Sequence, residues 1–73
     1  MPKLPVVSGA EAIRALERLG FVVMRQRGSH VIMRRGESGC AVPLHRELKI
    51  GTLSGVLRQA GLDTTEFIEA LKQ

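Results

Sequence analysis

The chain has 73 residues, of which 44% are apolar and 25% charged, with a formal net charge of +4. This length predicts a single domain over residues 1–73, and no apolar run approaches the ~20 residues that a membrane-spanning helix needs. The single cysteine, Cys40, excludes an internal disulfide, and the lack of tryptophan and tyrosine excludes aromatic stacking as the main way of binding any nucleic acid. The N-terminal stretch lacks the apolar core of a signal peptide, which predicts a cytoplasmic protein.

The first predicted element is a helix that follows Ser8. Ser8 and Glu11 have the S-x-x-E spacing of a capping box, in which each residue satisfies a free backbone N–H group of the other. Gly20 marks the end of this helix. Small and apolar residues recur at helical spacing between these signals, at Gly9, Ala12, Ile13, Leu16 and Leu19.

Three short strands are predicted next. The first is rich in β-branched and aromatic residues, and Gly28 supplies the turn that makes it a hairpin with the second. A second turn, at 36–39, leads to the third strand, which Pro43 ends or confines to a sheet edge. Cys40 is interpreted as a small strand residue. The predicted strands are 21–26, 30–34 and 40–42.

Two further helices are predicted after the loop 44–49. Gly61 closes the second helix, and Asp63 and Glu66 form another capping box at the start of the third. The apolar positions of the second helix are Ile50, Leu53, Val56, Leu57 and Ala60, and those of the third are Phe67, Ile68 and Leu71.

The predicted order α-β-β-β-α-α favours an α+β fold, in which helices cover one face of a three-stranded antiparallel sheet. A double-stranded-RNA-binding domain has the same order of helix, three strands and helix. That type of domain recognises RNA by shape and backbone rather than by stacking, which suits a chain without tryptophan or tyrosine.

The positive charge is concentrated in the front of the chain. Residues 1–60 carry ten basic and four acidic side chains, whereas 61–73 carry one basic and three acidic. The stretch 25–35, RQRGSHVIMRR, places His30 among four arginines and contains no acidic residue. A basic surface of this kind attracts polyanions, although an ordinary solvated surface with excess positive charge is an equally good interpretation of the charge alone.

Isolated polar groups in this region have simpler interpretations as well. His30 can be an exposed or hydrogen-bonded strand residue, and His45 a surface or loop-bracing one. Ser29 has no acidic neighbour in the sequence to support a nucleophilic role, so a hydroxyl that bonds the turn backbone is favoured. Without clustered Cys, Asp or Glu, the two histidines do not predict a metal site.

Two segments carry a resemblance to a known family. QRGSHVIMRR, followed by a glycine turn, and then AVPLHRELKIGTLSGVLRQAGLDTTEFIEAL resemble the HicA toxins, a family of ribonucleases that cleave messenger RNA. The resemblance extends over the chain from the first helix onward. It implies a fold of the double-stranded-RNA-binding type and a catalytic role for His30. The chain departs from the family at Met33, where an aromatic residue is common, and at Ile50, where proline is common.

These considerations lead to a prediction for the site. The unperturbed pKa of histidine, about 6.5, suits proton transfer in both directions near neutral pH, so His30 is predicted to act as general acid or base without a metal or cofactor. Arginine forks stabilise phosphate oxygens. The predicted RNA-binding residues are Arg27, Gly28, Ser29, Arg25 and Lys49.

The predicted partners are messenger RNA and a HicB-like antitoxin, with neither a membrane nor a small molecule involved. The antitoxin is expected to be acidic where it meets the basic site, and Met33 and Val22 add contact area if they lie on the open face of the sheet. The alternative is an RNA-binding module without catalytic power. The sequence leaves open which face of the strand 30–34 is buried.

Overall fold

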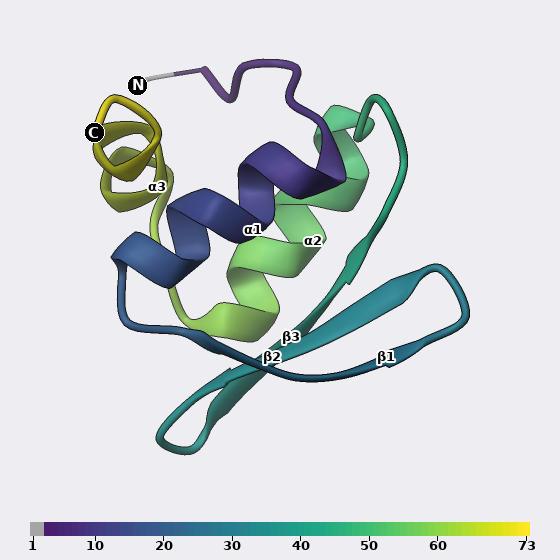
Figure 1. Ribbon diagram of the computed structural model, residues 1–73. Coiled ribbons are helices and arrows are strands. Elements are labelled where there is room, and N and C mark those ends of the chain that lie inside the picture. The colour runs from purple at the N-terminus through teal and green to yellow at the C-terminus, as the bar shows by residue number, and fades with distance from the viewer. Residues whose placement is uncertain (1–2) are drawn as a thin grey trace.

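The computed structural model describes residues 3–73, in which three helices and three strands follow the predicted order (Figure 1). The prediction of an α+β fold with the order α-β-β-β-α-α is therefore confirmed. The elements are α1 (Gly9–Arg18), β1 (Val22–Arg27), β2 (His30–Arg35), β3 (Ser38–Pro43), α2 (Ile50–Ala60) and α3 (Thr64–Leu71).

The strand boundaries differ from the predicted ones for local reasons. Phe21 precedes β1 because it has no partner in β2, and its N–H donates instead to the Leu16 carbonyl of α1 at 3.0 Å. The third strand begins at Ser38 rather than at Cys40 because Gly36 and Glu37 alone form the turn, with Gly36 at a φ of 59° that favours glycine. Pro43 is the last residue of β3, a position where the sheet tolerates the missing N–H of proline because the strand ends there.

Both predicted capping boxes are formed. The Ser8 hydroxyl accepts a hydrogen bond from the Glu11 N–H at 3.0 Å, and the Ser8 N–H donates to the Glu11 carboxylate at 2.8 Å. These bonds hold the pKa of Glu11 below its ordinary value. Asp63 and Glu66 make the equivalent pair at the start of α3. Among the helices of residues 3–73, none is long and apolar enough to cross a membrane.

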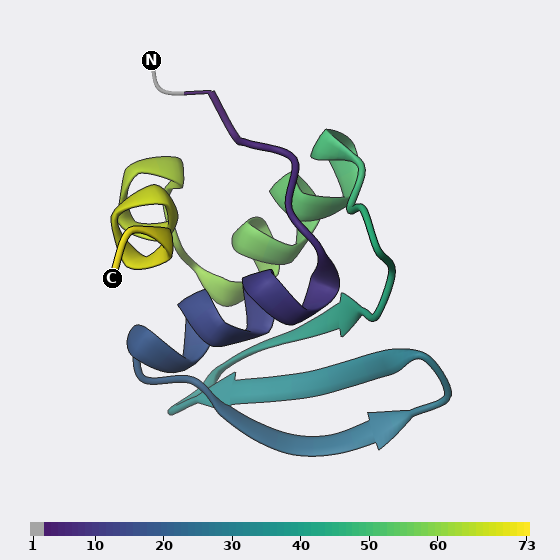
Figure 2. The same cartoon turned by 45° about the horizontal axis from the view of Figure 1, so that its top comes forward.

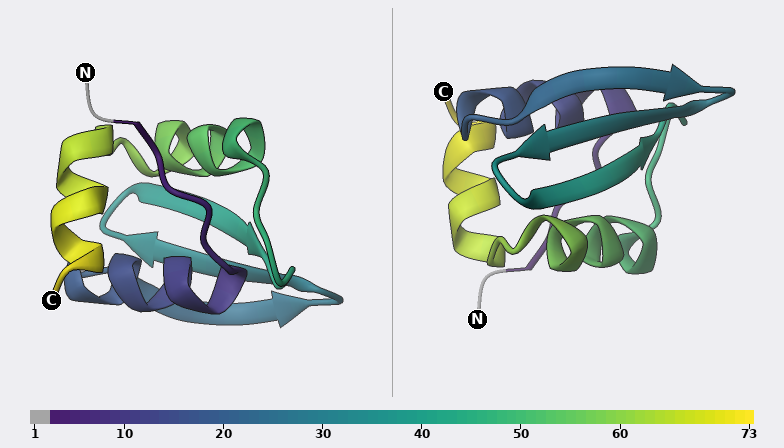
Figure 3. Two further views of the ribbon diagram at one scale, coloured as in Figure 1. Left: turned by 90° about the horizontal axis from the view of Figure 1, so that it is seen from above. Right: turned by 90° about the horizontal axis from the view of Figure 1, so that it is seen from below.

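The strands form one antiparallel sheet in the order β1-β2-β3, and the helices lie on one of its faces (Figure 2). Seen from below in Figure 3, the other face is bare, and α2 runs beside β3. The Gln59 side chain of α2 accepts the Ala41 N–H at 3.3 Å, so α2 covers the edge of β3. At the opposite edge, all six residues of β1 are exposed.

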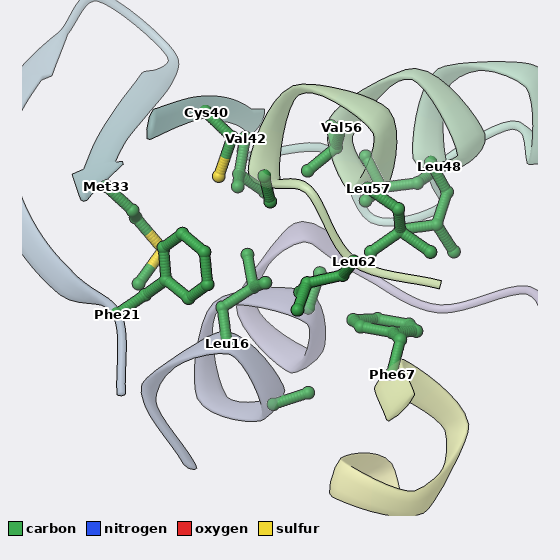
Figure 4. Packing of buried hydrophobic residues seen from close by; sticks show 14 of the residues in the cluster. Leu16, Phe21, Met33, Cys40, Val42, Leu48, Val56, Leu57, Leu62 and Phe67 are labelled. Carbon is green, nitrogen blue, oxygen red and sulfur yellow. The ribbon is translucent and has the colours of Figure 1, made fainter. Parts of the chain in front are cut away.

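The core lies between the sheet and the helices (Figure 4). In β2, Val31 and Met33 are buried, which places His30, Ile32 and Arg34 on the open face. Cys40 is a residue of β3, as the sequence predicted, and its burial raises the pKa of the thiol. The main helical contributions come from Leu16, Leu53, Val56, Leu57 and Phe67.

The contact area expected from Met33 depended on its lying on the open face, and that condition is not met. Its side chain has 0% of its surface exposed, so it contributes to the core and not to the open face. Methionine in place of the aromatic residue common in the family therefore changes the packing of the core between sheet and helices. Val22 does lie on the open face, opposite Arg34, and 56% of its surface is exposed.

Candidate functional site

A β-bulge in β1 determines which side chains lie on the open face. Val23 pairs with Met33 and Arg25 pairs with Ile32, so Met24 is an extra residue in β1. Strict alternation would have placed Arg25 on the same face as Val23, toward the helices. The bulge shifts the alternation by one residue and brings Arg25, and Arg27 after it, onto the open face.

His30 lies between two strand neighbours on this face. It pairs with Arg27 of β1 on one side and with Pro43 of β3 on the other, and its side chain is exposed. Side chains directly opposite each other in antiparallel strands have Cβ atoms about 5 Å apart. The imidazole of His30 and the guanidinium of Arg27 can therefore contact the same phosphate group.

The turn before His30 is braced on both sides. Gly28 and Ser29 form a two-residue loop, and Gly28 has a φ of 59°, a conformation that glycine adopts without strain. The Gln26 amide donates to the Gly28 carbonyl at 2.9 Å, and the Leu44 N–H donates to the Ser29 carbonyl at 2.7 Å. These bonds fix the backbone at the start of β2 and so the direction of the His30 side chain.

Three arginines of the open face have no carboxylate partner. Within residues 3–73 the one salt bridge joins Lys72 to Glu69, in α3 and its C-cap. Arg25, Arg27 and Arg34 therefore carry their charge toward solvent, and no side chain on the open face of the described strands is acidic. Such a face is strongly favourable for a polyanion, because each guanidinium offers a fork of donors to phosphate oxygens.

The neighbouring residues Arg34 and Arg35 have different surroundings. Arg35 donates to the Leu19 carbonyl at 2.8 Å, and its guanidinium lies 4.8 Å from the centre of the Phe21 ring. This cation–π contact holds Arg35 against the end of α1. Arg34 donates through Nε to the Gly36 carbonyl at 3.1 Å, which leaves its two terminal amino groups free for a ligand.

The remaining predicted residues are not on this face. Lys49 is the N-cap of α2, and that helix begins on the helical side of the sheet (Figure 2). Ser29 takes part in the turn through its carbonyl, and the expected bond from its hydroxyl to the turn is not found in the described chain. His45 is exposed and braces its loop through its carbonyl, which accepts the Gly9 N–H at 2.9 Å.

A hollow on the open face was not predicted from the sequence. It has a volume of about 390 Å³ and is lined by Met24, Arg25, Ile32 and Arg34. Alternate residues of a strand lie on the same face, so the sequence could have predicted that Ile32 and Arg34 share the face of His30. Met24 was not, because its position depends on the bulge. Across residues 3–73, no three His, Cys, Asp or Glu side chains come together as a metal-binding group.

These features define a small α+β domain with one packed sheet face and one bare, basic face around a single histidine. The family model described as HicA toxin of bacterial toxin-antitoxin matches residues 9–62, more than half of the chain. The chain therefore belongs to the HicA toxin family, and the matched range includes all three strands. Membership makes it a toxin of a toxin-antitoxin system, with an antitoxin as its partner. A search of curated proteins finds no match.

Proposed function

We propose that this toxin is an endoribonuclease that cleaves messenger RNA on the open face of its sheet, with His30 as general acid or base. The observation that carries the proposal is the pairing of His30 with Arg27 on an exposed face without acidic side chains. A proton-transfer group and a phosphate-binding group at adjacent positions are what RNA cleavage by the neighbouring hydroxyl requires.

The reaction forms one bond and breaks one. The 2′-oxygen of a ribose attacks the adjacent phosphorus, the bond from phosphorus to the 5′-oxygen breaks, and a cyclic phosphate is left. One proton leaves the 2′-hydroxyl and one reaches the departing 5′-oxygen. His30 performs one of these transfers, and water at the exposed site performs the other. Arg27 and Arg25 stabilise the negative charge that develops on the phosphate oxygens, and neither role requires a metal.

The backbone of the turn gives the RNA room to approach. Open space surrounds Gly28, where an added Cβ would meet no atom within 4 Å. A phosphate that lies over Gly28 and Ser29 would be next to both His30 and Arg27. Lys49 is then a more distant contact, at the start of α2, for RNA that extends beyond the sheet.

The test compares the two histidines. His30→Ala should lower the rate of RNA cleavage by about 10²-fold or more, because general acid–base catalysis contributes at least that much. His45→Ala removes the same side chain from an exposed loop and should retain the wild-type rate. Circular dichroism checks that both variants are folded. Equal rates for wild type and His30→Ala would overturn the catalytic role of His30.

The products and the metal requirement provide a second check on the chemistry. Cleavage should persist in excess EDTA, and one fragment should end in a cyclic phosphate. Activity that disappears with the chelator and returns with a divalent ion would contradict the acid–base mechanism. Fragments that end only in 3′-hydroxyl groups would contradict attack by the 2′-oxygen.

We further propose that a HicB-like antitoxin neutralises the toxin by covering this face. Its contact surface should be acidic opposite Arg25 and Arg27, because pairing those charges speeds association and blocks RNA from the same place. Val22, exposed beside them, provides apolar contact area. Family membership supports the existence of an antitoxin, and the bare basic face supports the location of its contact.

A second function is favoured by one observation. Within the described chain, no hydrogen bond from a protein group orients the imidazole of His30, although catalytic histidines are commonly held by a partner. An RNA-binding module without catalytic power, in which His30 donates a hydrogen bond to a phosphate, fits this environment. It predicts that His30→Ala weakens RNA binding and that the wild type releases no fragments.

A further inference from the structure

The hollow beside His30 has a composition that neither the proposed chemistry nor the family match explains. Its floor is Ile32 in the central strand, and Met24 and Arg25 of the bulge lie on one side. Arg34 lies two residues further along β2. The lining therefore combines two apolar side chains with two guanidinium groups, and neither guanidinium pairs with a carboxylate.

The position of the hollow relates it to the proposed cleavage site. His30, Ile32 and Arg34 follow one another on the same face of β2, and two residues of a strand span about 7 Å. An RNA strand that lies along β2 with a phosphate at His30 thus brings the next nucleotide over Ile32. This spacing is comparable with that of consecutive phosphates in an extended single strand.

The chemistry of the lining indicates what fits there. A nucleobase has two apolar faces, and proteins stack unpaired bases on aromatic side chains or on guanidinium planes. Methionine sulfur also makes favourable contacts with aromatic rings, and its flexible side chain adapts to their shape. A paired base is unable to enter, because its faces are covered by its neighbours in the duplex.

We propose that this hollow binds one unpaired RNA base, adjacent to the phosphate at His30, with Ile32 beneath the base and with Met24, Arg25 and Arg34 around it. The proposal deepens the proposed function and rests on it for the identity of the ligand as RNA. It makes the toxin selective for single-stranded RNA and assigns base-binding roles to Arg34, Ile32 and Met24.

The experiment measures binding by the full-length His30→Ala protein, which leaves the RNA intact. The probes are short single-stranded oligouridylates with one adenosine at a series of positions, each made with the adenine present or removed. Fluorescence anisotropy gives the affinity for each pair. At one position, removal of the adenine should weaken binding about tenfold, because the base loses its apolar contact with Ile32 and Met24 and its contact with the guanidinium groups.

Arg34→Gln in the same protein should abolish this difference, so that the two members of the pair bind equally and weakly. Arg14→Gln is the matched control, because Arg14 is an exposed arginine of α1 in the helical layer. It removes one positive charge and should leave the difference at about tenfold. A double-mutant comparison of this kind separates contact with the base from the general effect of charge.

Three results would overturn the proposal. The first is that removal of the adenine matters at no position, and the second is a difference that survives Arg34→Gln. Equal affinity for an oligonucleotide and for its duplex would do the same. Because no step of this experiment uses cleavage, it is judged separately from the proposed ribonuclease activity. If the protein shows the effect of the base but never cleaves RNA, the proposed base site stands and the catalytic role of His30 is overturned.

Discussion

The two faces of the sheet are made from the same strands but have different physical properties. On the helical face of β2, Val31 has 6% and Met33 0% of its surface exposed. On the other face, His30 and Arg34 are exposed and Ile32 is half-buried. Consecutive residues of one strand therefore contribute alternately to stability and to the candidate site. Substitutions on the two faces should change different measurements.

The difference has an energetic consequence. Fully burying one large apolar side chain contributes about 1.5–3 kcal/mol, so the helical face supplies much of the stability of this small domain. The open face brings positive charges together without acidic neighbours, and the diagonal neighbours Arg25 and Arg34 repel each other. A polyanion or an acidic partner relieves that repulsion when it binds. The open face thus contributes little to folding and much to recognition.

The largest expected effect comes from the packed face. Met33→Ala should lower the free energy of unfolding by about 2–5 kcal/mol, because it leaves a cavity among fully buried side chains. Ile32→Ala, the next residue in the chain, should cost about 1 kcal/mol or less, because its side chain is half-buried and faces the hollow. Urea titration of both variants measures this contrast. Similar losses at the two positions would contradict the division between the faces.

A smaller effect is expected from charge reversal on the open face. Arg27→Glu should lower RNA cleavage about a hundredfold, because it replaces a phosphate-binding group beside His30 by a repulsive one. It should also slow association with the antitoxin, most strongly at low salt, since the Debye length falls to ~8 Å at physiological ionic strength. Cleavage assays and stopped-flow mixing measure the two effects.

The control for this variant is Arg14→Glu, which makes the same charge change on α1, in the helical layer. It should alter the cleavage rate and the association rate far less. An Arg27→Glu protein that loses cleavage but still captures the antitoxin at the wild-type rate would show that the antitoxin binds elsewhere. The two proposed ligands would then not share the open face.

The smallest expected effect concerns β1, where the division between the faces is incomplete. Val23 has the orientation of a core residue, opposite Met33, yet 47% of its surface is exposed. Val23→Thr should therefore change the free energy of unfolding by about 0.5 kcal/mol or less. Val42→Thr places a hydroxyl at a fully buried position of β3 and should cost about 1–3 kcal/mol. Thermal unfolding compares them, and an equal loss at Val23 would mean that β1 is packed as β3 is.

The sequence by itself determined the features that depend on nearby residues. Ser8 with Glu11, and Asp63 with Glu66, identified the starts of two helices because a capping box is complete within four residues. Gly28 identified the first hairpin turn, and the α+β order followed from the periodicity of the segments. The His30 motif and the segments after it identified the family, which the match over 9–62 confirmed. The catalytic assignment of His30 stays a prediction.

Only the tertiary structure decided which side chains share a surface. The bulge at Met24 turns Arg25 and Arg27 toward His30, and no local pattern reveals it because it arises from the pairing of β1 with β2. A shift of one residue in register moves every side chain of a strand to the opposite face. The same pairing created the hollow at Ile32, while the packing of the helices took Met33 into the core and left Lys49 at the start of α2.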